Sequence, residues 1–221
     1  MAFIDIQHLS LGYGNKPVVT DLNLSIQQGE FLVVVGENGV GKTTLVRALL
    51  KQLTPHAGQI ARDPKVKIGY VPQFRNLDNE YPLSIRDFIA LNLPMKMMPW
   101  LTAVERQQVD RIIKATNLSS IADQPLGLAS GGEKQRTYLA QSLLSDPNLL
   151  ILDESTASLD PDSKIELLSL VQKFQQSGLT VIFVTHDWEL AQQFGTHFLH
   201  MEPGCYRNGT IDQLSQHLGG K

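Results

Sequence analysis

Residues 36–43 form a glycine-rich motif that reads Gly36-Glu37-Asn38-Gly39-Val40-Gly41-Lys42-Thr43. It fits the pattern of a phosphate-binding loop, in which two spaced glycines precede a lysine and a hydroxyl side chain. The apolar run Phe31–Val35 comes directly before it, and leucines and valines at helical spacing follow. A simple glycine-rich turn would account for the glycines alone. The strand, the spacing, the lysine and the hydroxyl together favour a nucleotide-binding loop.

The chemistry of such a loop comes from its backbone. N–H groups converge on phosphate oxygens, and a helix N-terminus adds partial positive charge. We expect Lys42 to reach the outer phosphates of ATP and the Thr43 hydroxyl to ligate Mg²⁺. The residues expected to contact the nucleotide are Gly36, Glu37, Asn38, Gly39, Val40, Gly41, Lys42, Thr43 and Thr44.

A second motif places two carboxylates, Asp153 and Glu154, directly after the apolar run Leu149–Leu152. Ligands bind at the carboxyl ends of parallel strands. We therefore expect Asp153 to hold Mg²⁺ and Glu154 to polarise the water that attacks the terminal phosphate. An ordinary acidic strand end is the alternative, which the phosphate loop in the same chain disfavours.

A third strand-end residue is His186, which follows the apolar segment Leu179–Val184 and Thr185. A lone histidine is more often structural than catalytic. Its place beside two other nucleotide-facing strand ends favours a contact with the γ-phosphate. Asp187 is expected to cap a helix that begins at Trp188.

Bulk composition restricts the possible partners and location. The chain has 221 residues, 19 basic against 22 acidic, and a net charge of −3, which gives no sign of nucleic-acid binding. Its longest apolar runs are far shorter than the ~20 residues that span a bilayer. The start has no secretory signal, and the single cysteine, Cys205, cannot form an internal disulfide. A soluble chain in the cytoplasm is expected.

The pattern along the chain predicts a mostly parallel α/β core. Two alternating segments, Phe3–Leu11 and Val18–Ile26, predict an antiparallel hairpin before the phosphate loop. The helix after the loop should stop near Thr54-Pro55. Strands are expected at Phe31–Val35, Ile68–Val71, Leu149–Leu152 and Leu179–Val184.

The remaining segments predict an inserted helical lobe and a β-rich end. Ser84, Thr102 and Ser130 each stand three residues before an acid, the signature of a helix N-cap, within roughly 84–145. Near the end, Thr196–Met201 should pair with a strand after Pro203-Gly204. A turn is expected at Asn208-Gly209 and a short helix from Asp212.

With these motifs in place, the chain resembles the ATP-binding cassette (ABC) ATPases over nearly its whole length. The matching segments beyond the phosphate loop and Asp153-Glu154 are Tyr70-Val71-Pro72-Gln73 (glutamine loop), Ser130-Gly131-Gly132-Glu133 (signature), Ser158-Leu159-Asp160 (aspartate loop), His186 (switch histidine) and Tyr13 (adenine-stacking aromatic). The resemblance implies a P-loop NTPase (RecA-like) parallel-sheet core with an N-terminal antiparallel β subdomain and an inserted α-helical subdomain, about 74–145, in one domain, 1–221.

The same resemblance implies a head-to-tail dimer that encloses two ATP molecules. Each ATP would lie on the Lys42 loop of one copy and under Ser130, Gly131 and Gly132 of the other. Asp160 either contacts this interface or caps its own helix. The implied catalytic residues are Glu154, His186, Gln73 and Lys42, and the implied Mg²⁺ ligands are Thr43, Gln73 and Asp153.

Two positions depart from the family pattern. The signature usually begins with leucine and ends with glutamine, whereas this chain has Ala129 and Glu133. Glu133 can still form a capping box with Ser130, but its charge would lie close to the γ-phosphate of a partner and weaken closure. Ser155 follows Glu154 in place of the common proline, and we expect little consequence.

The kind of cassette protein is indicated by the stretch Asp78–Asp87, which is similar to the corresponding stretch in ATPases of zinc and manganese importers. This resemblance implies import of divalent metal ions through separate membrane permease subunits, with an extracytoplasmic solute-binding protein, at the cytoplasmic face of the membrane. Residues Met95–Leu101 either contact a membrane subunit or pack the helical lobe.

Two other functions stay open at this point. The first is a soluble cassette ATPase that acts in assembly or repair without transport. The second is a phosphoryl-transfer kinase that uses the phosphate loop, against which the signature and His186 argue. Whether the working unit contains two identical copies is also open.

Overall fold

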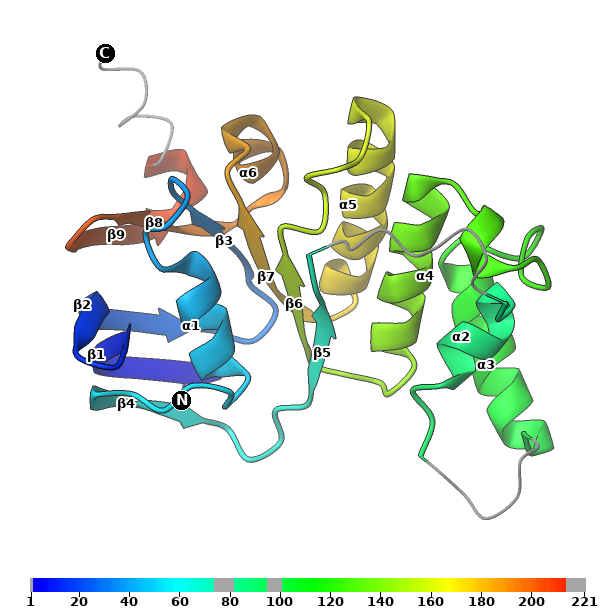
Figure 1. Cartoon of the computed structure of the whole chain (residues 1–221), viewed down its shortest axis with the longest axis horizontal. Coiled ribbons are helices and arrows are strands. Elements are labelled where there is room, and N and C mark those ends of the chain that lie inside the picture. The colour runs from blue at the N-terminus through cyan, green and yellow to red at the C-terminus, as the bar shows by residue number, and fades with distance from the viewer. Residues whose placement is uncertain (1, 74–81, 95–100, 214–221) are drawn as a thin grey trace.

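The computed structural model describes residues 2–73, 82–94 and 101–213, and within them the chain forms two β-sheets with helices packed on both faces of the larger one (Figure 1). The larger sheet has the strand order β5-β6-β7-β3-β8-β9. Its strands are β3 (Phe31–Val35), β5 (Ile68–Val71), β6 (Leu149–Asp153), β7 (Thr180–Thr185), β8 (His197–Glu202) and β9 (Cys205–Thr210). All neighbours pair in parallel except β8 and β9, which are antiparallel. The predicted parallel core is confirmed.

The smaller sheet is antiparallel and confirms the predicted N-terminal hairpin. It consists of β1 (Ile4–Tyr13) between β2 (Lys16–Ile26) and β4 (Ala57–Arg62). Sequence patterning missed β4, whose residues do not alternate clearly between apolar and polar and are exposed or only partly buried. Pairing with β1 decides that this segment is a strand.

The strands β3, β6 and β7 are buried on both faces, because their side chains alternate between two apolar clusters. In β3, Leu32 and Val34 join the cluster that contains α1 (Lys42–Leu49) and the antiparallel sheet. Phe31, Val33 and Val35 join the opposite cluster, which contains α5 (Pro161–Gln176) and α6 (Trp188–Phe194). Figure 1 shows α1 between the two sheets. Burial on both faces explains the continuous apolar runs in the sequence.

The inserted helices are α2 (Ile85–Ala90), α3 (Ala103–Ala115) and α4 (Gly131–Leu143), with a 3₁₀ turn at Leu126–Leu128. They pack around a third apolar cluster. All three predicted caps are confirmed: Ser84, Thr102 and Ser130 each accept a hydrogen bond from the backbone N–H three residues on. The subdomain boundary near residue 74 stays a prediction, since residues 74–81 lie outside the described part.

Two predicted boundaries are wrong. Helix α1 ends at Leu49, not near Thr54, because Lys51 adopts a left-handed conformation (φ 58°) and reverses the chain toward β4. No turn forms at Asn208-Gly209, because β9 continues through both residues in register with β8. The helix expected from Asp212 begins at residue 211 and is described only to 213.

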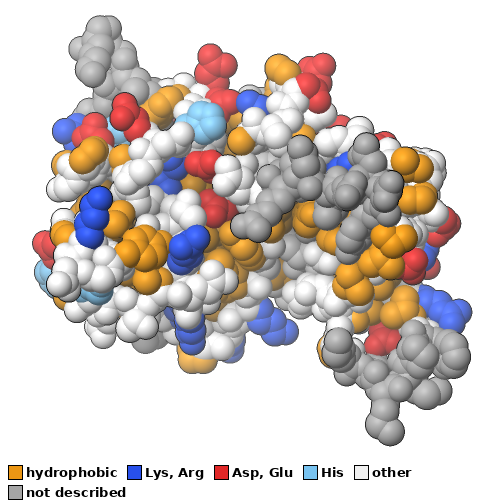
Figure 2. Space-filling model, viewed as in Figure 1, with side chains coloured by type: hydrophobic (Ala, Val, Ile, Leu, Met, Phe, Trp, Pro, Cys, Tyr) orange, Lys and Arg blue, Asp and Glu red, His pale blue; other side chains and the backbone are white. Residues whose placement is uncertain are grey.

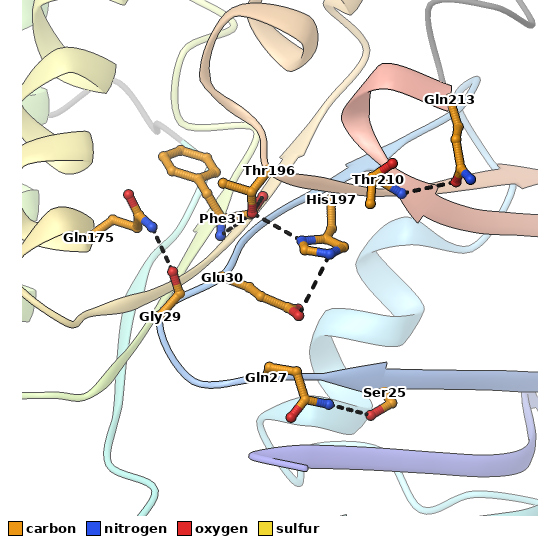
Figure 3. A network of polar contacts seen from close by, with 10 residues as sticks. All are labelled: Ser25, Gln27, Gly29, Glu30, Phe31, Gln175, Thr196, His197, Thr210 and Gln213. Carbon is orange, nitrogen blue, oxygen red and sulfur yellow. Dashed lines mark hydrogen bonds and ion pairs between the residues drawn. The ribbon is translucent and has the colours of Figure 1, made fainter.

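A polar network fastens the segment that joins β2 to β3 (Figure 3). The carbonyl of Gly29 accepts a hydrogen bond from Gln175 of α5 (2.6 Å), and the N–H of Phe31 donates to the Thr196 hydroxyl (2.9 Å). His197 of β8 lies 3.8 Å from the Glu30 carboxylate. These contacts hold the antiparallel sheet at a fixed place relative to the parallel sheet.

Among the described helices, none combines the length and the apolar character needed to cross a lipid bilayer. Residues 95–100 of the segment Met95–Leu101 and residues 78–81 of the stretch Asp78–Asp87, both singled out above, lie outside the described residues.

Candidate functional site

The phosphate loop connects the carboxyl end of β3 to α1, as predicted, and its glycines are required by close packing. Gly36 has φ 152°, and a Cβ there would lie 2.3 Å from the backbone oxygen of Met201. Gly41 has φ 108°, and a Cβ would lie 2.8 Å from the side chain of Val19. No other residue type fits this conformation without displacing backbone or core side chains.

A cavity of about 410 Å³ lies over this loop. Its lining residues are Tyr13, Val18, Asn38, Gly39, Gly41, Lys42, Thr43, Thr44 and Glu154. The ring of Tyr13 is 47% exposed at the end of β1, and its hydroxyl accepts a hydrogen bond from Arg47 (3.1 Å). The cavity thus joins backbone N–H groups, one cation and one accessible aromatic ring, which is a set of partners for a nucleotide.

Lys42 is buried at the base of this cavity. Its Nζ donates to the backbone carbonyls of Gly36 (2.8 Å) and Glu37 (2.9 Å) and lies 3.8 Å from Oε1 of Glu154. Burial lowers the pKa of the Lys42 ammonium, and the carboxylates of Glu154 and Asp153 act in the opposite direction. A bound phosphate would add negative charge beside the ammonium and would favour its protonated form further.

Asp153 ends β6 and is only 4% exposed. Its Oδ2 accepts a hydrogen bond from the hydroxyl of Tyr70 (3.3 Å), whereas its Oδ1 is buried without a hydrogen-bond partner among the described residues. Burial is the main cause that raises the pKa of this carboxyl. A buried carboxylate oxygen without a partner is a ligand for a hard cation, so the residues present fit Mg²⁺.

Glu154 follows in a left-handed conformation with φ 47°. Its N–H donates to the carbonyl of Val184 on β7 (3.1 Å), and its Oε2 accepts from the side-chain amide of Gln73 (3.1 Å). The structure therefore brings together three predicted catalytic side chains, Lys42, Gln73 and Glu154, from three different segments.

His186 lies at the end of β7 and is exposed. It lines a small pocket with Glu154, as expected for neighbouring strand ends. It also lines a cavity of about 480 Å³ on the other side of the loop, where Trp188 meets the ring of His200 edge to face (4.9 Å). Asp187 caps α6 as predicted by accepting from the N–H of Leu190 (3.2 Å).

The signature residues lie at the N-terminus of α4, and neither Ser130 nor Gly131 nor Gly132 lines the cavity over the phosphate loop. Ser130 forms a full capping box, in which its N–H donates to Oε2 of Glu133 (2.7 Å). Its neighbour Leu128 is 72% exposed. Within one chain, these predicted nucleotide contacts stand apart from the phosphate loop.

Asp160, predicted to be a cap or an interface residue, caps α5 and accepts from the N–H of Ser163 (3.0 Å). Hydrogen bonds from Ser163 lower the pKa of its carboxyl. Asp160 is exposed and also lies outside the lining of the cavity. The capping role is confirmed, and the interface role stays a prediction.

Two contacts near the site were not found by sequence reasoning. Tyr70 was noted as part of a motif, but its bond to Asp153 depends on strand pairing. Gln135 of α4 donates to the backbone carbonyl of Ser155, and both residues are fully buried. Neither contact has a spacing signal, because its partners are 83 and 20 residues apart.

Acidic and basic side chains are interspersed on the face shown in Figure 2, which carries no large patch of one sign. This agrees with the net charge of −3. The prediction that nucleic acid is not a partner stays untested.

Comparison with known proteins gives a consistent result. Residues 19–157 match the family model described as ABC transporter. The zinc import ATP-binding protein ZnuC of Yersinia pseudotuberculosis is 34% identical over 215 residues, which is 97% of this chain and 81% of that protein. The ZnuC protein of Pseudomonas putida is 35% identical over 97% of this chain and 80% of its own length.

Solved structures are similar over the same extent. CbiO1 from Clostridium perfringens, part of the ABC transporter complex cbiONQ, superposes with a TM-score of 0.86 at 27% identity. The match covers 98% of this chain and 92% of that one. The similarity thus extends over both sheets and the inserted helices.

Proposed function

Because the chain belongs to the ABC transporter family, and its fold and ATPase domain are those of that family, we propose that it is the ATP-hydrolysing subunit of a zinc importer. It would act through separate membrane permease subunits, at the cytoplasmic face of the membrane, with an extracytoplasmic solute-binding protein. The observation that carries the proposal is that Lys42 and Glu154 line one cavity over the phosphate loop, where Glu154 also accepts a hydrogen bond from Gln73. The similarity to zinc import proteins supports the choice of cargo.

The loop and Lys42 would bind the phosphates of ATP. The backbone N–H groups of residues 39–44 and the Lys42 ammonium offer charge-assisted donors in a buried setting, where each is worth about 1.5–3 kcal/mol. Tyr13 would stack on the adenine ring. The exposure of its ring supports this role.

Asp153, Thr43 and Gln73 would hold Mg²⁺, which when bound would neutralise phosphate charge in the transition state. The unpartnered Oδ1 of Asp153 supports this assignment. Glu154 would orient the attacking water and accept its proton, and His186 would contact the γ-phosphate. Their shared pocket at the ends of β6 and β7 supports this division of roles.

A second copy would complete the site. Ser130, Gly131, Gly132 and Asp160 lie outside the lining of the cavity of their own chain, which supports a role on the nucleotide of a partner. ATP would favour the closed dimer because it contacts both copies only in that state. Hydrolysis would return the pair to the open state and so drive the permease.

The test is metal accumulation in cells that lack this chain. The wild-type protein should restore zinc uptake, and Glu154→Gln should not, whereas the exposed substitution Glu189→Gln should restore it fully. If the wild-type protein restored only manganese uptake, the proposed cargo would be manganese and not zinc. If the chain is recovered only with soluble proteins after gentle solubilisation of membranes, the proposed role in transport is wrong.

A further inference from the structure

Tyr70 and Asp153 meet at the edge of the sheet because their strands pair in parallel. In the register of β5 and β6, Tyr70 stands opposite Ile151, two residues before Asp153. Residues two apart on a strand share a face, so Ile151 and Asp153 point to the same side of the sheet. Tyr70 packs against the apolar cluster that contains Ile151. Its hydroxyl lies 3.3 Å from Oδ2 of Asp153.

This contact gives the two carboxylate oxygens of Asp153 different surroundings. The phenolic hydroxyl donates one hydrogen bond, to Oδ2. The other oxygen, Oδ1, is buried and has no hydrogen-bond partner within the described ranges. A carboxylate that is held by one oxygen loses rotational freedom about its Cβ–Cγ bond and keeps the second oxygen for another ligand.

We infer that Tyr70 is a positioning residue for the magnesium site, and that its hydroxyl orients Asp153 so that Oδ1 is preset to ligate the cation. This inference rests on the proposed function. Outer partners that orient metal ligands contribute substantially to metal affinity, because the ligand is then already ordered before binding.

The position of Tyr70 in the fold makes it suited to this role. Its neighbour Val71 is fully buried and ends β5, and two residues later Gln73 contacts Glu154. The end of β5 therefore reaches both acidic residues at the end of β6. A strand held by parallel pairing places the hydroxyl more firmly than an exposed loop would.

The experiment measures magnesium dependence directly. In a Glu154→Gln background, which prevents turnover, ATP affinity is measured by calorimetry in EDTA and across a series of magnesium concentrations. Tyr70→Phe should leave the affinity for ATP in EDTA unchanged. It should raise about tenfold the magnesium concentration at which half of the magnesium-dependent gain in ATP affinity is reached. Binding of Mn²⁺ in the presence of ADP, followed by electron paramagnetic resonance, should weaken by a similar factor.

Tyr206→Phe is the matched control, because it also removes a partly buried phenolic hydroxyl, one that bonds to Thr20 in the antiparallel sheet. If both variants have the parent's magnesium dependence, Tyr70 only stabilises the fold and the inference is wrong. A parent that binds no ATP even with magnesium would instead refute the proposed function. Should Tyr70→Phe not fold, Tyr70→Met removes the same hydroxyl with an adaptable side chain and carries the same expectation.

Discussion

At the scale of single residues, Glu154 shows how the fold positions the proposed general base. A left-handed backbone at a non-glycine residue costs about 1–3 kcal/mol and persists only where its surroundings enforce it. Here the bond from its N–H to Val184 and the end of the β6–β7 pairing enforce it. The carboxylate is thereby directed to Lys42 and Gln73.

Replacing this carboxylate tests the assigned base. Glu154→Gln keeps the size of the side chain but cannot accept a proton, so ATP hydrolysis should fall about 10²- to 10⁴-fold. ATP binding should persist, because the phosphate loop is unchanged. Phosphate release and calorimetry on the same preparation check both parts, with Glu189→Gln as control. Hydrolysis near the wild-type rate would mean that another group is the base.

His200 predicts a pH dependence of stability. Burial against Trp188 lowers the pKa of this imidazole from 6.5, with Glu202 on its own strand acting against this shift and Arg207 on β9 acting with it. The folded state therefore binds fewer protons than the unfolded state near pH 6.5. The stability from this group is complete above that pH and is lost as the pH falls toward the folded pKa.

His200→Phe keeps an aromatic ring beside Trp188 and removes the titration. The decrease in unfolding free energy between pH 7.5 and pH 5.5, from urea titrations, should be smaller in this variant than in the wild type. The same substitution at the exposed His56 is the control. An equal pH dependence in wild type and His200→Phe would show that this partly buried imidazole contributes nothing to it.

At the scale of elements, the helix caps combine stability with function. Ser84 and Ser130 cap α2 and α4 with the same type of bond. Only Ser130 lies in the signature. Two serine caps that each accept a backbone N–H in one subdomain allow the structural role to be separated from a nucleotide contact.

Ser84→Ala and Ser130→Ala should each lower stability by about 0.5–2 kcal/mol, since each leaves a helix N–H without its cap. In a domain of this size each kcal/mol lowers the melting temperature by about 2–4 °C. Only Ser130→Ala should also reduce ATP hydrolysis. Calorimetric melting and phosphate release compare the two. An equal loss of hydrolysis in both variants would leave Ser130 as a cap and nothing more.

At the scale of the whole molecule, the residues of the proposed site are divided between two parts of the fold. The parallel sheet carries the phosphate loop and the carboxylates at one edge, while α4 carries the signature in the helical subdomain. Gln135 ties α4 to the carbonyl of Ser155, so the two parts contact each other next to Glu154. We expected that serine in place of the common proline at position 155 would have little consequence. That expectation stays a prediction, although the backbone of Ser155 takes part in this contact.

Glu133 adds a negative charge to the surface that would face a partner copy in the proposed dimer. Glu133→Gln keeps a side-chain oxygen for the capping box and removes one negative charge near a partner's γ-phosphate. In the Glu154→Gln background it should strengthen ATP-dependent dimerisation severalfold, measured by light scattering across protein concentrations. The exposed Glu189→Gln on α6 is the charge-matched control, because it removes one negative charge from a different helix. A dimer of unchanged or lower affinity would contradict the charge argument.

Local chemistry could be predicted from the sequence alone. The phosphate loop, the strand ends with Asp153, Glu154 and His186, and the caps at Ser84, Thr102, Ser130, Asp160 and Asp187 all depend on neighbouring residues. Glycine spacing, apolar periodicity and cap chemistry act within a few positions. These local features can therefore be predicted from the sequence without knowledge of the tertiary structure.

Only the tertiary structure decided the rest. The strand β4, the bond of Tyr70 to Asp153 and that of Gln135 to Ser155 arise between distant parts of the chain. Many donors and acceptors in the chain have the same local chemistry. Sheet register and packing decide which of them come within bonding distance. Because a hydrogen bond forms wherever folding brings a donor to an acceptor, its partners follow from the assembled sheets and helices and not from spacing along the chain.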